Sequence, residues 1–137
     1  MAKLPPSATS DIPSSRDIRL FENSRYYTCN QETTSAATIL RYVSPVKAKL
    51  RGGLMRVATV AGTSGNTTVT LNINGSAVSG ATGSVASTAS NGTEVAIPGG
   101  DAQVQIGDEV EVVVTAVTAG TASSGLSVRI QVVDDLS

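Results

Sequence analysis

The chain has 137 residues, enough for one folded domain and an appendage. Ten Lys and Arg nearly balance eleven Asp and Glu, for a net charge of −1, so no global basic field exists to attract nucleic acid or an anionic membrane. The absence of His and the presence of one cysteine, Cys29, exclude an intrachain disulfide, His-based catalytic triads and most transition-metal sites.

The first segment, residues 1–34, is rich in Pro, Ser and Thr and has balanced charges but no sustained hydrophobic period. Such a segment cannot bury enough apolar area on its own to offset its ordering entropy, so we expect an extended N-terminal arm. An ordinary flexible terminus is the alternative. Five side chains in the arm are costly to leave in water and predict contact with a partner surface: Ile18, Leu20, Phe21, Tyr26 and Tyr27.

The start of the chain also bears on its location. Met-Ala-Lys-Leu-Pro-Pro lacks the apolar region of a secretion signal, and no run of about 20 apolar residues occurs anywhere. We therefore expect synthesis in the cytosol and no membrane span.

Alternating apolar and polar residues predict short strands in the next part of the chain. These strands are expected over residues 37–43, 46–51, 54–61, 67–74 and 76–78. Gly52-Gly53 is expected to turn the chain between two of them, and Asn74-Gly75 is a strong hairpin signal.

The last part of the chain continues this pattern. Residues 80–92, rich in Ser, Ala, Thr and Gly, predict an exposed loop that holds a weak strand. The strand over residues 106–117 organises the rest, with Val110, Val112 and Val114 on its buried face. Three further elements are expected: a strand over 93–97 that ends at Pro98-Gly99-Gly100, a loop over 118–125 and a strand over 126–133.

About eight short strands with Gly-rich turns and no helical period predict an all-β fold, a jelly-roll or related Greek-key β-sandwich. An immunoglobulin-like sandwich is the nearest competitor, although its Cys and Trp markers are absent. The predicted organisation is an extended N-terminal arm over residues 1–34 and a β-sandwich domain over residues 35–137.

Charge is unevenly distributed along the chain. Residues 33–92 contain no acidic side chain but hold a basic span: Arg41, Lys47, Lys49, Arg51 and Arg56. From Thr93 onward, seven acidic residues face only Arg129. Two interpretations of this charge distribution stay open: solvated outer faces of opposite sheets, or a polarity that docks the domain onto copies of itself or onto a charged scaffold. In the second interpretation the basic span binds a partner.

Few residues have catalytic potential. Cys29 would need a nearby cation to lower the pKa of its thiol, and Arg25 is the only candidate. Glu109 and Glu111 share a strand face, as a hydrolase pair or, with Asp108, a calcium ligand set would require. Two solubilising glutamates on an exposed face is the favoured interpretation. We expect no enzyme activity, no cofactor and no metal site.

Four segments carry a resemblance to a known class of proteins. They are Gly-Gly-Leu-Met-Arg-Val at 52–57, Thr-Thr-Val-Thr-Leu-Asn-Ile-Asn-Gly-Ser-Ala-Val at 67–78, Ile-Gly-Asp-Glu-Val-Glu-Val at 106–112 and Leu-Ser-Val-Arg-Ile at 126–130. An Asn-Gly hairpin and a Gly-Asp-x-Val-x-Val strand of this kind recur in small β-sandwich virion proteins of tailed bacteriophages, which the chain resembles over roughly two thirds of its length.

The resemblance implies a capsid cement, or decoration, protein on the virion exterior, which binds the outer surface of the major capsid protein shell and stabilises the head. Many such proteins are homo-oligomers on symmetry axes, so a trimer is expected ahead of a dimer. Several reach across neighbouring major capsid subunits with an extended arm, a role that suits residues 1–34. Neither nucleic acid nor membrane is an expected partner.

Two other classes stay open. A phage tail or fibre β-domain would bind a receptor on the host surface through the loops at 80–92 and 118–125. An accessory domain of a carbohydrate-processing enzyme would use the same loops. Their lack of aromatic and charged side chains argues against tight sugar binding.

Overall fold

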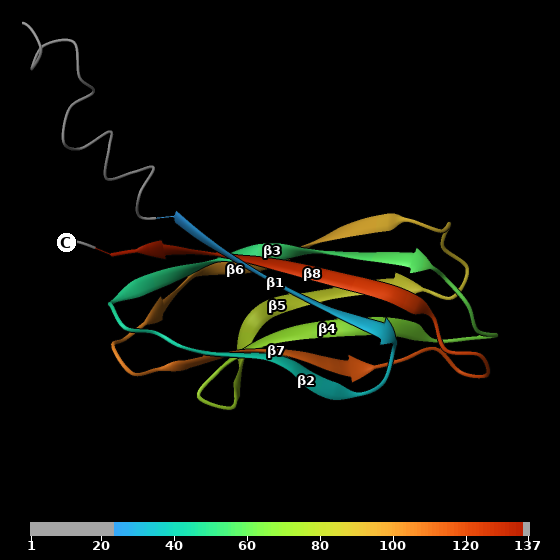
Figure 1. Ribbon diagram of the computed structural model, residues 1–137, viewed down its shortest axis with the longest axis horizontal. Helices are drawn as coiled ribbons and strands as arrows, with labels where there is room; N and C mark the ends of the chain where they lie inside the picture. The colour runs from blue at the N-terminus through green and yellow to red at the C-terminus, as the bar shows by residue number, and fades with distance from the viewer. Residues whose placement is uncertain (1–23, 136–137) are drawn as a thin grey trace, which may run out of the picture.

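A computed structural model describes residues 24–135, which form two antiparallel sheets packed face to face with no helix among them (Figure 1). The strands are β1 (Ser24–Thr33), β2 (Ala37–Val43), β3 (Ala48–Thr59), β4 (Asn66–Ile73), β5 (Ser76–Ala86), β6 (Thr93–Val104), β7 (Glu109–Ala116) and β8 (Ser124–Asp134). The predicted all-β sandwich is confirmed.

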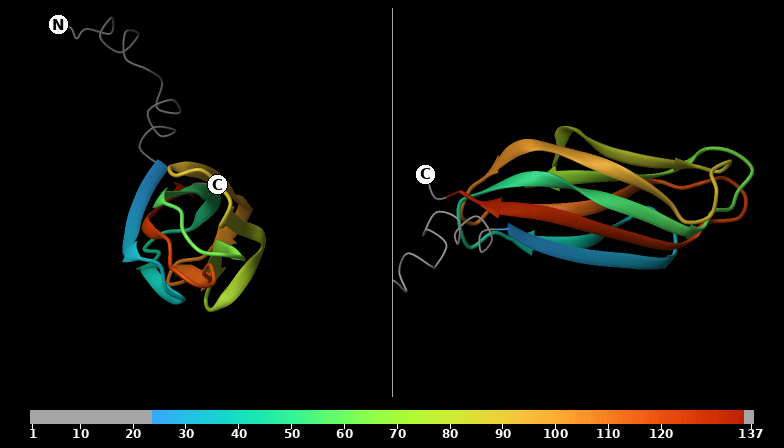
Figure 2. Two further views of the ribbon diagram at one scale, coloured as in Figure 1. Left: turned by 90° about the vertical axis from the view of Figure 1, so that its right-hand side faces the viewer. Right: turned by 90° about the horizontal axis from the view of Figure 1, so that it is seen from above.

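The strand order identifies the topology. Sheet A has the order β1-β8-β3-β6, and sheet B has the order β2-β7-β4-β5. The first half of the chain therefore pairs with the second half in reverse order, β1 with β8, β2 with β7, β3 with β6 and β4 with β5. A ribbon of paired strands wrapped into two layers in this way is a jelly roll, and Figure 2 shows the two layers from the end and from above.

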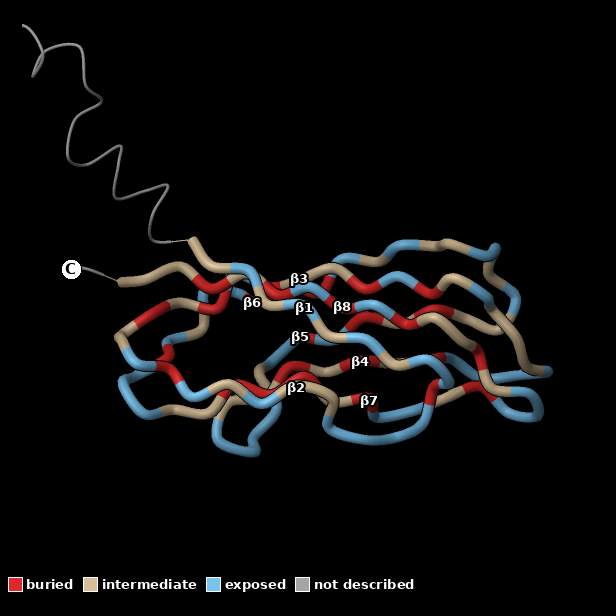
Figure 3. The backbone as a smooth tube through the Cα atoms, viewed as in Figure 1, coloured by how far each residue is buried: buried red, intermediate tan, exposed pale blue. Residues whose placement is uncertain are grey.

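The core lies between the two sheets, and Figure 3 shows how buried and exposed positions alternate along the strands. On β7 the predicted inward residues Val110, Val112 and Val114 are all buried. Opposite them, sheet A contributes a similar row on β8: Leu126, Val128, Ile130 and Val132. Because the inward positions of most strands are aliphatic, the two inner faces fill one shared apolar layer.

Two predictions about glycine-rich segments were wrong: Gly52-Gly53 does not turn the chain, and Pro98-Gly99-Gly100 does not end a strand. β3 runs without interruption through Gly52-Gly53, with a register shift between Leu50 and Gly52, and β6 runs through Pro98-Gly99-Gly100. A Cβ on Gly52 would lie 2.3 Å from the carbonyl oxygen of Ile97, and a Cβ on Gly99 would lie 2.4 Å from backbone atoms of β3. The glycines permit a close approach of two backbones at a bulge, and the proline is tolerated because β6 is an edge strand.

The segment predicted as an exposed loop that holds a weak strand, residues 80–92, begins with the second half of β5. β5 extends through Gly80 to Ala86, with Ala81, Gly83 and Val85 buried on alternate positions. A Cβ on Gly83 would lie 2.9 Å from Cγ1 of Ile97, so small residues are required where β5 packs against β6. Only the residues after Ala86 connect the two strands.

The N-terminal boundary of the sandwich also differs from the prediction. Residues 24–33, assigned to the extended arm, form β1, which pairs with β8 from Ser24 opposite Val133 to Thr33 opposite Ser124. They join the sheet because the side chains of Tyr27 and Cys29 pack against the core. The rest of the arm, with Ile18, Leu20 and Phe21, lies outside the described residues. Within residues 24–135, no helix is long and apolar enough to cross a membrane.

Candidate functional site

The outer face of sheet A presents three rows of side chains across its four strands. The strand register places these residues side by side, and partners in antiparallel strands point to the same face. In the order β1, β8, β3 and β6, the rows are Tyr26, Gln131, Gly52 and Pro98 in the first, Thr28, Arg129, Leu54 and Ala96 in the second, and Asn30, Ser127, Arg56 and Glu94 in the third.

Two adjoining hollows lie on this face, with volumes of about 480 and 380 Å³. Leu54 and Arg129 border both of them. Gly52 has no side chain to fill the first hollow, and its close approach to β6 lies at the floor of that hollow. Tyr26, with 57% of its surface exposed, stands at the rim. The hollows are shallow and open to solvent, which suits a flat contact better than an enclosed small molecule.

Cations dominate the lining of the two hollows. The guanidinium carbon of Arg129 lies 5.3 Å from the centre of the Tyr26 ring, within cation–π range. Arg51 is paired, with its Nε 3.3 Å from Oδ1 of Asp101. Within residues 24–135, neither Arg129 nor Arg56 has a carboxylate oxygen within 4.0 Å.

The outer face of sheet B has a different chemistry. Its hydroxyl groups contact one another across the strands, with Oγ1 of Thr68 2.9 Å from Oγ of Ser84 and the Oγ1 atoms of Thr70 and Thr82 3.3 Å apart. At the β2 side of the face, Nε of Arg41 lies 3.6 Å from Oε2 of Glu111. The middle of this face thus carries small, uncharged hydroxyl side chains.

Three residues of the predicted basic span, Lys49, Arg51 and Arg56, lie on β3 at the outer face of sheet A, and the other two lie elsewhere. Arg41 lies on sheet B beside Glu111, and Arg51 pairs with Asp101. Nζ of Lys47 lies 3.9 Å from Oδ2 of Asp135. Because the jelly roll pairs the first half of the chain with the second, basic and acidic segments meet across strands. Among the described residues, Arg41, Lys47 and Arg51 therefore have acidic partners, while Lys49, Arg51 and Arg56 share the outer face of sheet A.

One edge of the sandwich is closed by aromatic side chains. The rings of Tyr27 on β1 and Tyr42 on β2 stack across the two sheets with centroids 4.2 Å apart and a 33° tilt. Burial raises the pKa of the Tyr27 hydroxyl, the neighbouring Tyr42 adds to the rise, and Arg25 opposes it. Tyr27, predicted to bind a partner, is thus directed into the fold, whereas Tyr26 remains exposed.

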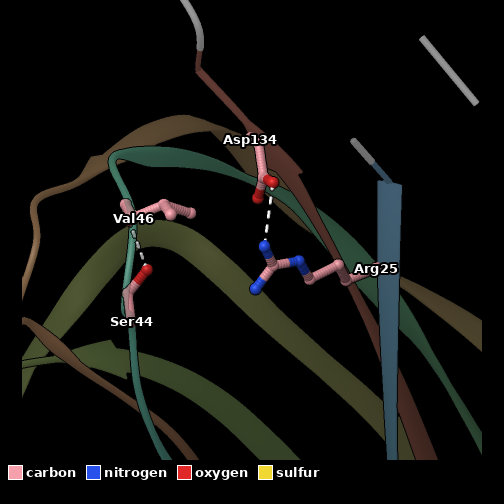
Figure 4. Close-up of polar contacts among 4 residues, drawn as sticks. All are labelled: Arg25, Ser44, Val46 and Asp134. Atoms are coloured by element: carbon pink, nitrogen blue, oxygen red, sulfur yellow. Dashed lines mark hydrogen bonds and ion pairs between the residues drawn. The ribbon is translucent and has the colours of Figure 1, made fainter. Parts of the chain in front are cut away.

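Figure 4 shows two polar contacts that hold the chain together, one between β1 and β8 and one in the connection between β2 and β3. Nη2 of Arg25 donates a hydrogen bond of 2.9 Å to Oδ2 of Asp134, joining the start of β1 to the end of β8. Nearby, the Ser44 hydroxyl donates to the carbonyl oxygen of Val46 and shapes the connection between β2 and β3. These groups serve the fold.

The residues considered for catalysis are also tied into the fold. Burial raises the pKa of the Cys29 thiol to about 11, so it is protonated at neutral pH, and Arg25 pairs with Asp134 instead. Glu111 is 6% exposed beside Arg41. Hydrogen bonds from Asn74 and from the Gln105 amide lower the pKa of Asp108. In the part of the chain that the structure describes, no group of three or more His, Cys, Asp or Glu is placed to hold a metal ion.

Comparison with known proteins leaves the family open. No family model and no curated protein matches the chain. Among solved structures, it is similar to a family 35 carbohydrate binding module from Clostridium thermocellum, at 14% identity and a TM-score of 0.35 over 82% of this chain and 89% of that chain. It is also similar to the capsid asymmetric unit of cyanophage Pam1, at 20% identity and a TM-score of 0.38 over 82% and 81% of the two chains.

A third similar structure is a CocE/NonD family hydrolase from Staphylococcus aureus, at 12% identity and a TM-score of 0.39. The alignment covers 82% of this chain but 36% of the hydrolase. TM-scores this low carry no assignment of function, and the three proteins differ widely in what they do.

Proposed function

We propose that this protein is a structural virion protein, a capsid cement protein that binds the outer surface of the major capsid protein shell and stabilises the phage head. The observation that carries the proposal is the outer face of sheet A. It is broad and shallow, with an exposed tyrosine, Tyr26, above two open hollows and two arginines, Arg56 and Arg129, that have no carboxylate oxygen within 4.0 Å among residues 24–135. Arginine and tyrosine are enriched where proteins bind other proteins, and an open face of this kind suits a large partner surface.

The resemblance of four strand segments to small phage virion proteins supports the same role, since it falls on the strands that build this sandwich. A homo-oligomer on the head, a trimer ahead of a dimer, belongs to the proposal, as does a capsid-binding arm. With β1 inside the sandwich, the arm of the proposal is residues 1–23, and Ile18, Leu20 and Phe21 are its apolar anchors.

The runner-up, a phage tail or fibre domain that binds a host receptor, would depend on two loops. Residues 80–86 of the first loop belong to β5, and Ala119 in the second is bonded to the loop before β4 through Thr63 and Ser64. Both segments are thus shorter or more constrained than a recognition loop requires, which favours the cement role.

Co-sedimentation with undecorated heads tests the proposal. Full-length protein should sediment with heads at a copy number comparable to that of the major capsid protein, and heads carrying it should resist heating better. A variant lacking residues 1–23 keeps every described strand, and we expect its binding to collapse. Unchanged binding by this variant would transfer the docking role to the sandwich, whereas no binding by the full-length protein would contradict the cement role itself.

The matched control is a variant lacking residues 1–34. It also loses β1, and with it the Tyr27–Tyr42 contact and the Arg25–Asp134 ion pair, so it should be unfolded or aggregated. If this variant folds as well as the shorter deletion by circular dichroism and thermal melting, β1 is dispensable to the sandwich and our placement of the arm boundary at residue 23 is wrong.

A further inference from the structure

The two hollows on sheet A combine three properties that together specify a ligand. The first is charge: three arginines, Arg51, Arg56 and Arg129, line them against one glutamate, Glu94. Asp101 engages Arg51, but no described carboxylate lies within 4.0 Å of the other two guanidinium groups. The face is therefore cationic although the whole chain carries a net charge of −1.

The second property is a preorganised anion site at the boundary of the two hollows. Arg129 borders both hollows, and its contact with the Tyr26 ring restrains the guanidinium on the outer face. A planar guanidinium held in this way can donate two parallel hydrogen bonds to one carboxylate. Because the side chain is already restrained, less conformational entropy is lost when a ligand binds.

The third property is an apolar strip beside these cations. Leu54 is half-buried between Arg129 on β8 and Ala96 on β6, and Pro98 follows in the next row. These residues offer a surface for an aliphatic side chain about one strand away from the carboxylate site, since neighbouring strands lie about 4.8 Å apart. The strip and the arginines alternate across the face.

We propose that this face binds an extended acidic peptide segment, which places a carboxylate on Arg129 and an aliphatic side chain against Leu54. The proposal rests on the proposed function in that such a segment would be exposed on the capsid shell, and it adds the chemistry of the docking site. A nucleic acid is a poorer fit, because Glu94 lies among the arginines and Tyr26 is the only aromatic ring in the lining. An acidic sugar would leave the apolar strip without a partner.

Nuclear magnetic resonance titration with a synthetic peptide of alternating Glu and Leu tests this inference. At low salt, amide signals of residues 26–30, 52–56 and 127–131 should shift, and those of β4 and β5 should not. A peptide with Gln in place of Glu should bind at least about fivefold more weakly, because it lacks the charge. Raising the salt concentration should weaken the binding of the Glu peptide and leave the binding of the Gln peptide unchanged.

Two variants with the same change in net charge separate the site from the overall charge. Arg129→Gln removes the anchor, and Thr82→Glu adds a negative charge on the exposed outer face of sheet B. Arg129→Gln should lower the affinity for the Glu peptide at least about fivefold, and Thr82→Glu should change it little. The dispersion of the amide spectra reports whether each variant is folded.

Each outcome decides the inference separately from the capsid role. No shift with the Glu peptide, shifts on sheet B, equal effects of the two variants, or tighter binding of a DNA or anionic glycan probe would overturn it. Heads that bind the wild type and Arg129→Gln equally would overturn the site and leave the cement role standing. Peptide binding at Arg129 without any binding to heads would support the site and contradict the cement role.

Discussion

The outer faces of the two sheets are built by the same strand alternation, yet they leave different groups for a partner. On sheet B, Thr68 and Ser84 satisfy each other across strands, and Arg41 lies beside Glu111. On sheet A, Arg129 and Arg56 have no described carboxylate partner, and Tyr26 is mostly exposed. The outer face of sheet A is therefore the better candidate for binding. On sheet B, the hydroxyl and charged groups already contact one another, so fewer of them are available to a partner.

The difference begins in the backbone. Sheet A contains a bulge where Gly52 of β3 and Gly99 of β6 approach closely, and this removes side chains from the middle of its outer face. On the outer face of sheet B, threonine and serine hydroxyls instead contact one another across the strands. The hollow is thus a by-product of the packing of two glycine-containing strands.

The largest expected effect on stability comes from adding a side chain at Gly52, where the backbones of β3 and β6 lie close together. Gly52→Ala should lower the free energy of unfolding by about 3 kcal/mol or more, because the new Cβ would lie 2.3 Å from the Ile97 carbonyl oxygen at a φ of +126°. Gly80→Ala on sheet B is the control: its φ is also positive, but nothing lies within 4 Å, so about 1 kcal/mol is expected. Urea denaturation measures both, and equal costs would show that β3 and β6 are not this close.

A second prediction tests the contact between Tyr27 and Tyr42, which joins the two sheets at one edge of the sandwich. Tyr27→Leu and Tyr42→Leu should each cost about 1–2 kcal/mol of unfolding free energy. The double variant should cost less than the sum by about 0.5–1.5 kcal/mol, because the ring contact at 4.2 Å is lost only once. Strict additivity in this cycle would mean that the rings do not interact.

A third prediction concerns the end of sheet B. The Asn74 side chain donates to Asp108 at 2.9 Å and accepts from the Glu109 amide at 2.9 Å, tying the β4–β5 turn to the start of β7. Asn74→Gly keeps the left-handed φ of 53° but loses both bonds, at about 1 kcal/mol. Asn74→Ala adds backbone strain and should cost about 1 kcal/mol more. Thermal melts that rank Ala above Gly would contradict this account.

The same substitution has a pH signature. The folded pKa of Asp108 is lowered, so its contribution to stability is present above the unfolded value of about 3.9 and is lost as pH falls through the folded pKa. Asn74→Gly removes the first cause of that shift, so the carboxyl pKa should rise toward its ordinary value. Carboxyl chemical shifts recorded between about pH 2 and pH 6 measure it; an unmoved pKa would assign the effect to the Gln105 amide.

The smallest change in stability at neutral pH is expected for Cys29→Ala, because the half-buried thiol is neutral there. With a pKa of about 11 in place of about 8.5, alkylation by iodoacetamide near pH 8 should be roughly two orders of magnitude slower in the folded than in the unfolded protein. Stability should also fall above about pH 8.5, where only the unfolded thiol ionises, and Cys29→Ala should reduce that fall. Fast alkylation of the folded protein would contradict the partial burial of Cys29 on β1.

Much of the fold could be predicted from the sequence because strand alternation is a local signal. Val110, Val112 and Val114 were identified as buried from their spacing alone, and they are. Tyr27 and Cys29 carry the same alternation, but prolines and balanced charges around them favoured an arm. Of the candidate partner-binding residues, Tyr26 lies on the rim of the sheet A hollow, Arg51 and Arg56 line the hollows, and Arg129 was not predicted. No signal in the sequence could separate Arg129 from an ordinary exposed arginine.

By itself, the sequence determined an all-β domain with one aliphatic core, because the period of two depends only on neighbours along the strand. Only the tertiary structure decided whether Gly52-Gly53 turns the chain or lets two backbones meet, since its partner Gly99 is distant in the sequence. The same holds for charge: the basic and acidic stretches are separate in the chain, and antiparallel pairing brings Arg51 to Asp101 while it leaves Arg129 without a described carboxylate. Contacts between residues far apart in the sequence leave no local pattern in it. These contacts decide which face of the sandwich keeps charged groups available to a partner.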